Sequence, residues 1–195
     1  MSGFRDELRE FRREPARRVA LRARLVRPLR VRNFHSFGEG SIVDRPDWVY
    51  GAWKIAIGAR VLILRGAWLA VERAAWAPDD EPVLRIGDGV GMRPRCAISA
   101  SESITIEDNV ILGTGCSVID SDHTHSPNEN VLFNPAVTAP IRIGRGTWLG
   151  DRVTVLKGAD IGAHCTIGAG SVVRGTIPDH SVAVGVPARV VGSTR

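Results

Sequence analysis

The sequence predicts an all-β solenoid, a parallel β-helix, and three observations support this prediction. Between residues 143 and 173 a branched apolar residue heads every successive hexad: Ile143, Leu149, Val155, Ile161, Ile167 and Val173. A six-residue period fits neither a helix nor an alternating strand. Glycine follows four of these heads, and small side chains recur at the fifth position: Thr147, Val153, Ala159, Cys165 and Ser171. A repeated inward side chain, with space beside it and a glycine that permits a turn, is the pattern of stacked short strands.

The same period extends toward the N-terminus with interruptions. It is present over residues 57–69, is lost over residues 74–82 and returns over residues 86–98. It then slips by two residues before it continues at residue 106. Insertions in a solenoid fall at corners and leave the stacked strands intact. We therefore expect a longer corner between residues 99 and 103.

The composition is that of one soluble domain. The chain has 195 residues, of which 44% are hydrophobic and 24% charged, enough to build a sizeable core. The first fifteen residues carry charges throughout and lack the apolar central run of a secretory signal, so a cytoplasmic location is expected. Cys96, Cys116 and Cys165 each fit the fifth position of a hexad, and we interpret them as buried packing residues.

Residues 1–38 form a basic N-terminal arm. Eleven arginines and four acidic residues lie within residues 1–32, so the net charge of +5 arises entirely in this arm. Phe4, Leu8 and Phe11 recur at helical spacing and predict an amphipathic helix. Two interpretations stay open: a peripheral contact with an anionic membrane surface, or a solvated arm packed on its own subunit or a neighbour. The chain has twenty-four arginines and only two lysines, a bias typical of genomic base composition, so we discount the arginine content as a functional sign. No nucleic-acid partner is expected.

The β-helix itself is expected over residues 39–191, followed by a short tail, residues 192–195. Its largest interruption is residues 120–140, DSDHTHSPNENVLFNPAVTAP, which lack the hexad pattern. About twenty irregular residues inside a repeat domain are uncommon and usually functional. A β-helix fills its own axis, so a binding groove needs a second wall from this protruding loop or from another subunit.

Four motifs stand out in the C-terminal half: Trp-Leu-Gly at residues 148–150, Ile-Gly-Ala-Gly-Ser-Val-Val at 167–173, Ile-Pro-Asp at 177–179 and Gly-Val-Pro-Ala-Arg-Val-Val at 185–191. These motifs resemble those of the hexapeptide-repeat acyltransferases, in particular the sugar O-acetyltransferases among them. The resemblance covers roughly residues 40–191. It implies a left-handed coil, a homotrimer with active sites between adjacent subunits, and acetyl-CoA as the acyl donor, with no metal.

The loop supplies the candidate catalytic residues. Acyl transfer to a hydroxyl needs a base that titrates near neutral pH, and histidine is such a base. The Asp-His-Thr-His-Ser of residues 122–126 resembles the Asp-His-x-His loop of sugar O-acetyltransferases, which implies that His125 or His123 is the base. We favour His125. Asp122 or Asp120 is near enough to orient the imidazole.

The same resemblance implies a coenzyme site on the outer wall. The positions are Trp148, Gly150, Asp151, Gly168, Ala169, Arg174 and Arg189. Glycine and alanine keep the wall low where the coenzyme passes, and arginine suits its phosphates. Arg174-Gly175 departs from the Thr-Lys that the family often has at this place.

The expected function is therefore transfer of an acetyl group from acetyl-CoA to a hydroxyl of a sugar or glycan precursor. Two alternatives stay open. One is a zinc carbonic anhydrase of the γ type, with His123, His125 and His164 as ligands across a subunit boundary. The other is a scaffold without catalysis.

Overall fold

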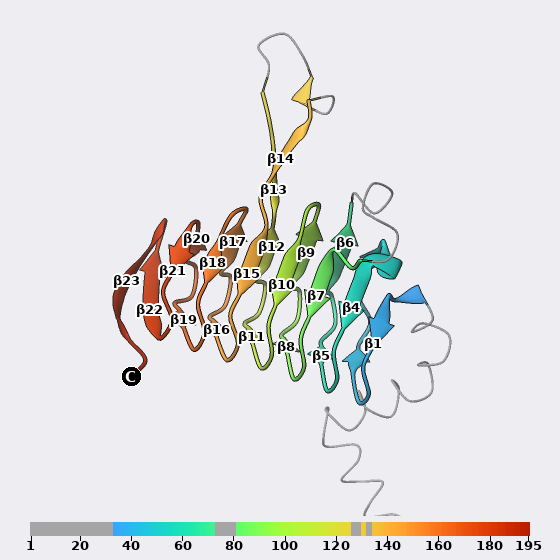
Figure 1. The fold of residues 1–195 in the computed structure, drawn as a ribbon, viewed down its shortest axis with the longest axis horizontal. Coiled ribbons are helices and arrows are strands. Elements are labelled where there is room, and N and C mark those ends of the chain that lie inside the picture. The colour runs from blue at the N-terminus through green and yellow to red at the C-terminus, as the bar shows by residue number, and fades with distance from the viewer. Residues whose placement is uncertain (1–32, 73–80, 126–129, 132–133) are drawn as a thin grey trace, which may run out of the picture.

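The protein folds into a parallel β-helix with three flat faces (Figure 1). The computed structural model describes residues 33–72, 81–125, 130–131 and 134–195. Most of the basic arm expected over residues 1–38, including the helix predicted from Phe4, Leu8 and Phe11, lies outside the described residues. Each coil of the solenoid places one strand in each of three sheets, here called A, B and C, and the next coil pairs with it in parallel.

The strands are short, as the hexad repeat predicts. Sheet A contains β1 (Ser36–Phe37), β4 (Ile55–Ile57), β7 (Leu84–Ile86), β10 (Ile104–Ile106), β15 (Ile141–Ile143), β18 (Asp160–Ile161) and β21 (Thr176–Ile177). Sheet B contains β2 (Ile42–Val43), β5 (Leu62–Ile63), β8 (Gly91–Met92), β11 (Ile111–Leu112), β16 (Trp148–Leu149), β19 (Thr166–Ile167), β22 (Ser181–Gly185) and β23 (Ala188–Ser193). Sheet C contains β3 (Trp48–Tyr50), β6 (Trp68–Val71), β9 (Ala97–Ala100), β12 (Ser117–Ile119), β17 (Thr154–Leu156) and β20 (Val172–Val173). A 3₁₀ turn, η2 (Ala52–Lys54), precedes β4, and the first strand β1 begins three residues before residue 39, where the solenoid was expected to begin.

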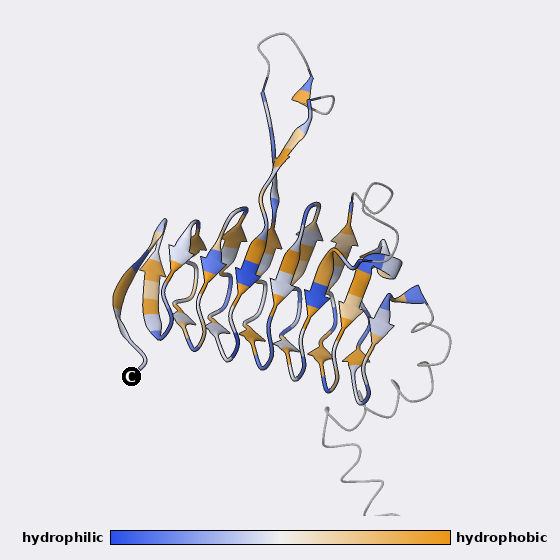
Figure 2. Ribbon diagram, viewed as in Figure 1, coloured by the Kyte–Doolittle hydropathy of each residue, from blue (hydrophilic) through white to orange (hydrophobic). Residues whose placement is uncertain are grey.

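The hexad heads form columns inside the coil. In sheet B the column consists of Ile63, Met92, Leu112, Leu149, Ile167 and Ala183, all of which are buried. Figure 2 shows the apolar residues recurring on the strands of successive coils. Burial of these columns is the main source of stability. Because the columns fill the axis, ligands are left with the outer faces and edges.

The fifth-position residues and the glycines fit the corners as predicted. Cys96, Cys116 and Cys165 are buried, and the Cys116 thiol donates a hydrogen bond to the Gly150 carbonyl 3.2 Å away. A Cβ on Gly150 would lie 2.7 Å from the backbone nitrogen of Ala169 in the next coil. Glycine is therefore required at this corner by the spacing of the coils.

Several corners depart from the six-residue period, and two of these departures concern the coils around the loop and the C-terminus; one of the two was predicted. Ile98 and Ile106 head consecutive strands eight residues apart, and the extra length forms the longer corner expected between residues 99 and 103. The other departure was not foreseen. Ile177 pairs with Ile161 although it follows Val173 by only four residues, so the hexad beginning at Val173 is shortened by two.

The C-terminus closes the solenoid by changing direction. Strand β23 runs antiparallel to β22 and ends sheet B, with Val184 opposite Arg189. The repeat pattern did not predict this antiparallel cap. None of the helices in the described part of the chain is long and apolar enough to cross a membrane.

Candidate active site

The loop of residues 120–140 projects from one edge of the prism. It leaves after β12 in sheet C and returns before β15 in sheet A, so its root lies at the edge between these two sheets, here called the C–A edge (Figure 1). Two antiparallel strands, β13 (Ser121–His123) and β14 (Ala136–Thr138), form a ribbon at its base. This ribbon projects away from the wall of the solenoid (Figure 1).

Both candidate histidines stand on this ribbon or directly beyond it. His123 ends β13 opposite Ala136, and His125 follows two residues later; both side chains are exposed. Thr124 between them is fixed, because its hydroxyl donates to the Pro135 carbonyl at 2.9 Å. The buried Asn134 amide donates in turn to the Thr124 carbonyl at 3.0 Å. The backbone between the imidazoles is thus anchored, and the choice between the two histidines stays open.

The two aspartates near the histidines have different surroundings. Asp120 is fully buried, and its carboxylate accepts three backbone N–H hydrogen bonds. Burial raises the pKa of Asp120 above its ordinary value, against the opposing effect of those three donors. Asp122 is exposed and lies 3.7 Å from the Lys157 ammonium. Only Asp122 therefore has a carboxylate on the surface near the histidines.

Five of the seven coenzyme candidates line a different edge, between sheets B and C, here called the B–C edge. Trp148 projects outward from strand β16 of sheet B and is 52% exposed. Gly150 and Asp151 form the corner after β16, and Gly168 and Ala169 form the corresponding corner of the next coil. One oxygen of Asp151 accepts the Thr114 N–H at 2.8 Å, so this carboxylate also joins two coils.

Of the two remaining coenzyme candidates, Arg189 lies near the B–C edge, whereas Arg174 lies at a different edge. Arg189 faces Val184 across the terminal hairpin, and a Cβ on Gly168 would lie 2.7 Å from a methyl group of Val184. Arg189 is therefore near the low corners of Gly168 and Ala169. Arg174 follows β20 of sheet C and precedes β21 of sheet A, which places it at the C–A edge with the loop.

In one copy of the chain, the candidate site residues therefore lie at two different edges of sheet C. The histidines, Asp122 and Arg174 lie at one edge, and the other six candidates lie at or beside the other. Sheet B, which carries Trp148, is the face opposite the C–A edge. His164 occupies neither edge: it lies between sheets A and B, stacked on His180 with ring centroids 5.2 Å apart.

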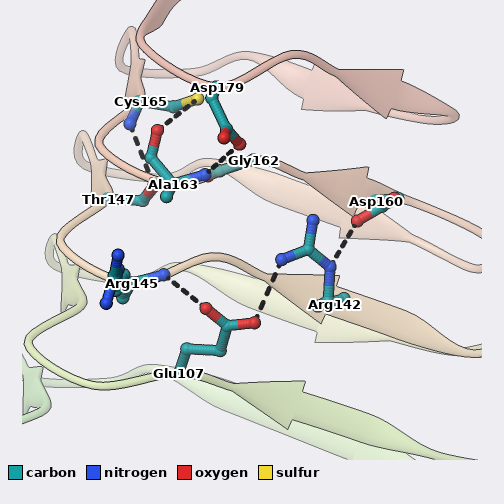
Figure 3. A network of polar contacts seen from close by, with 9 residues as sticks. All are labelled: Glu107, Arg142, Arg145, Thr147, Asp160, Gly162, Ala163, Cys165 and Asp179. Carbon is teal, nitrogen blue, oxygen red and sulfur yellow. Dashed lines mark hydrogen bonds and ion pairs between the residues drawn. The ribbon is translucent and has the colours of Figure 1, made fainter.

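A polar network on sheet A was missed by the sequence analysis. Arg142 bonds Glu107 at 3.0 Å and Asp160 at 2.7 Å, and the Arg145 N–H donates to Glu107 at 2.9 Å (Figure 3). The signal was present, because Arg142 and Asp160 each directly precede a hexad head and so point outward. A shallow groove of about 530 Å³ beside this network includes Arg85, Thr105 and Arg145 but none of the candidate site residues.

The fold and wall define the class of protein, a hexapeptide-repeat β-helix. Residues 140–175 match the family model described as bacterial transferase hexapeptide (six repeats). Together with the solved structures that share the fold, this match confirms the left-handed parallel β-helix and the resemblance to hexapeptide-repeat acyltransferases.

Three curated relatives make the resemblance more specific. The chain is 37% identical over 127 residues to a probable acetyltransferase of Mycobacterium tuberculosis, a match that covers 65% of this chain and 42% of that protein. It is 32% identical to the putative lipopolysaccharide biosynthesis O-acetyl transferase WbbJ of Escherichia coli, over 56% of this chain and 60% of the relative. It is also 32% identical to the galactoside O-acetyltransferase of Escherichia coli, over 54% and 62%. The chain thus spans 42 to 62% of the length of these relatives.

Two solved structures share the fold. A maltose O-acetyltransferase from Clostridium difficile is 25% identical with a TM-score of 0.58, and the match covers 83% of this chain and 71% of that one. A mutant of the N-acyltransferase AntD from Bacillus cereus, in complex with dTDP and coenzyme A, is 18% identical with a TM-score of 0.70, over 86% and 88%. At the lower identity, the likeness is one of fold alone.

Proposed function

We propose that this chain is an acetyl-CoA-dependent O-acetyltransferase whose acceptor is a hydroxyl of a sugar or glycan precursor. The names of the relatives support the reaction class, since one is a galactoside O-acetyltransferase and another a putative lipopolysaccharide biosynthesis O-acetyl transferase. The exposed loop histidines supply a base, and the low corners at Gly150 and Gly168 suit a long coenzyme. The separation of these two sets onto different edges is the observation on which the proposal depends.

The active site is composed from two copies of the chain. Within one copy the histidines at the C–A edge lie across the prism from Trp148 on sheet B. A neighbouring copy that presents its C–A edge to the B–C edge of the first copy places its imidazoles beside Trp148 and Ala169. The contact is heterologous, and a closed ring of three copies satisfies it. Arg174 then approaches the coenzyme from the same neighbour as the histidines.

The outer surface of sheet C supports such a ring. In such a ring each copy contacts one neighbour through its C–A edge and the other neighbour through its B–C edge. Sheet C, which lies between these two edges, then faces the three-fold axis. The outward side chains on its strands include ten uncharged ones: Trp48, Tyr50, Trp68, Ala97, Ser99, Ser117, Ile119, Thr154, Leu156 and Val172. Trp48, Tyr50 and Trp68 are 50%, 49% and 45% exposed in the single chain. Exposed aromatic groups of this kind favour burial in an interface.

The reaction follows from these placements. His125 or His123 takes the proton of the acceptor hydroxyl as its oxygen attacks the thioester carbonyl carbon. A backbone N–H of the wall stabilises the negative charge that develops on the carbonyl oxygen. The carbon–sulfur bond then breaks, and the departing thiolate receives the proton from the imidazolium. Asp122 orients the imidazole and stabilises its cationic form.

The coenzyme is held by the B–C edge. Trp148 offers an exposed ring face to the pantetheine arm or the sugar. Gly168 and Ala169 let the chain of the coenzyme approach the backbone closely, and Arg189 provides a cation for a phosphate. Asp151 bounds the same track while it hydrogen-bonds the neighbouring coil.

The zinc alternative has less support in the geometry. His164 stacks on His180 between sheets A and B, away from the loop edge. Within the described residues of one copy, no three His, Cys, Asp or Glu side chains gather in a way that would hold a metal ion. Metal analysis of the purified protein distinguishes the two functions, because the carbonic anhydrase requires stoichiometric zinc.

A thermal shift with coenzyme A tests the proposal before any acceptor is known. A ligand that binds the native state must raise the Tm, by an amount that grows with its concentration above Kd. We expect a rise with coenzyme A and acetyl-CoA, and a smaller one for Arg189→Ala. Release of free thiol from acetyl-CoA in the presence of a sugar panel then identifies the acceptor class. An unchanged Tm at millimolar coenzyme A would favour the scaffold.

A further inference from the structure

The root of the loop lies beside a long corner of the solenoid. The corner at residues 99–103 is two residues longer than the repeat requires, and it lies one coil before the loop. Strands β9 and β12 are neighbours in sheet C, so the loop begins directly beside this corner. The two irregular features therefore meet at one place.

Asp120 connects them. Its carboxylate accepts the N–H groups of Ser101 at 2.7 Å, Glu102 at 2.8 Å and Ser103 at 2.9 Å. Its side chain is completely buried. Hydrogen bonds to an ionised acceptor are about twice as strong as neutral ones. The extra length of the corner turns three successive N–H groups toward one carboxylate.

The returning strand of the loop is attached at the same point. The Asp120 carbonyl accepts the Ala139 N–H at 3.0 Å, and the Ala139 carbonyl accepts the Gly158 N–H at 3.2 Å. One coil earlier, the Ser103 carbonyl accepts the Ile141 N–H at 2.9 Å. Asp120 thus ties the outgoing and returning strands of the loop to the coil before them.

No comparable anchor is needed at ordinary corners. Asp88, Asp108 and Asp179 also accept backbone N–H groups from an adjacent coil, but each accepts only one such bond and lies at least partly in solvent. These three lie between sheets A and B, away from the loop. Asp120 differs from them in both the number of bonds and the depth of burial.

We propose that Asp120 is a positioning residue for acetyl transfer, which fixes the direction in which the loop leaves the wall and hence the reach of the histidine base. The inference rests on the proposed function. His123 is only three residues from Asp120, and the ribbon between them has a single register. A small rotation of the ribbon at its root therefore displaces both imidazoles. A displacement of about 1 Å at a reacting group can lower the rate about 100-fold.

The test compares Asp120→Asn with the matched control Asp108→Asn. The asparagine keeps the shape of the side chain but replaces one acceptor oxygen by an NH₂ group that faces the backbone donors. We expect kcat for acetyl transfer to fall by about 10- to 100-fold, while KM for acetyl-CoA and the Tm rise with coenzyme A stay at their wild-type values. Hydrogen exchange of the amides of residues 101–103 is expected to accelerate in Asp120→Asn. For Asp108→Asn we expect both kcat and the hydrogen exchange at residues 101–103 to stay at their wild-type values.

The outcomes separate the two proposals. Wild-type kcat in a folded Asp120→Asn protein would overturn the positioning role, as would a rise in KM for acetyl-CoA at unchanged kcat. Unchanged exchange at residues 101–103 would overturn the anchor itself, and this measurement needs no acceptor. A wild-type protein that neither gains stability from coenzyme A nor transfers acetyl would instead refute the proposed function.

Discussion

The two edges of sheet C are built on opposite principles. The B–C edge is regular: its corners repeat coil after coil, with glycine where a Cβ would meet the neighbouring backbone, as at Gly150. The C–A edge is interrupted by the loop, whose root depends on the buried Asp120 and on Ala139. The regular edge offers a long, even track, and the irregular edge offers groups that reach away from it.

This difference indicates how a catalytic site can be built on a repetitive solenoid. Repetition stabilises the wall but gives each coil nearly the same surface. Under the proposed function, the regular wall binds the coenzyme and the interruption supplies the base. Because the two sets of candidate residues lie on different edges of one chain, the proposal needs two copies placed edge to edge.

The largest effect is expected from the loop histidines. Removing a general base typically costs 10²- to 10⁴-fold in rate, so we expect one of His125→Ala and His123→Ala to lose activity on about this scale. Both side chains are exposed, so the Tm of either variant should stay near that of the wild type. Initial rates of acetyl transfer and melting curves check both statements. Rates close to wild type in both variants would show that neither loop histidine is the catalytic base.

A pair of adjacent residues on the regular side gives the next largest effect. Leu149 is buried between Leu112 and Ile167, whereas Trp148 beside it points outward. Leu149→Ala should lower the free energy of unfolding by about 2 to 5 kcal/mol. Trp148→Ala should leave the stability of the single chain nearly unchanged and weaken coenzyme A binding by about 3- to 10-fold.

Denaturant unfolding and titration calorimetry distinguish the two variants. A Trp148→Ala protein with wild-type affinity for coenzyme A would show that the ring serves only to cover surface. The coenzyme track would then have to lie elsewhere on the wall.

Part of this architecture could be read from the sequence, and the reasons differ from residue to residue. The hexad heads were predictable because each points inward at a fixed spacing, as Leu149 does. The shortened hexad after Val173 was not, because only the pairing of Ile177 with Ile161 reveals it. The histidines and Trp148 were identified through motifs. Their separation onto two edges needed the strand order of the coils, which no local pattern contains.

The contacts that hold the loop were equally hidden. Asp120 was expected only as an alternative partner for an imidazole, yet its carboxylate is used by backbone groups 17 to 19 residues earlier in the chain. Such a contact depends on how the coils stack, and it produces no periodic pattern in the sequence. The network of Glu107 and Arg142 on sheet A escaped for the same reason.

The smallest effect is expected from Glu107, which follows β10 at the corner between sheets A and B, away from both edges of the site. Partial burial alone would raise the pKa of Glu107, but the bonds from the Arg145 N–H and the Arg142 guanidinium outweigh it and hold this pKa below its ordinary value. Because the folded pKa is the lower one, the stabilisation is present at neutral pH and is lost as the pH falls below the usual glutamate value of about 4.3. For Glu107→Gln we expect a loss of less than about 1 kcal/mol at neutral pH.

Melting curves across the acidic range check this sign. The difference in Tm between wild type and Glu107→Gln should shrink on acidification. A difference that grows would contradict the assigned direction of the pKa shift. Acetyl transfer should be unaffected at neutral pH.

Mixed assemblies test the composite site most directly. One variant carries His123→Ala and His125→Ala in the loop, and the other carries Ala169→Trp, whose exposed side chain blocks the coenzyme track without entering the core. Each is expected to be inactive alone. Co-expression with two affinity tags, and purification through both, yields mixed rings of three in which about one site in three combines an intact loop with an intact B–C edge, so about a third of wild-type activity should return. Mixed assemblies that form but stay inactive would contradict a site shared between copies.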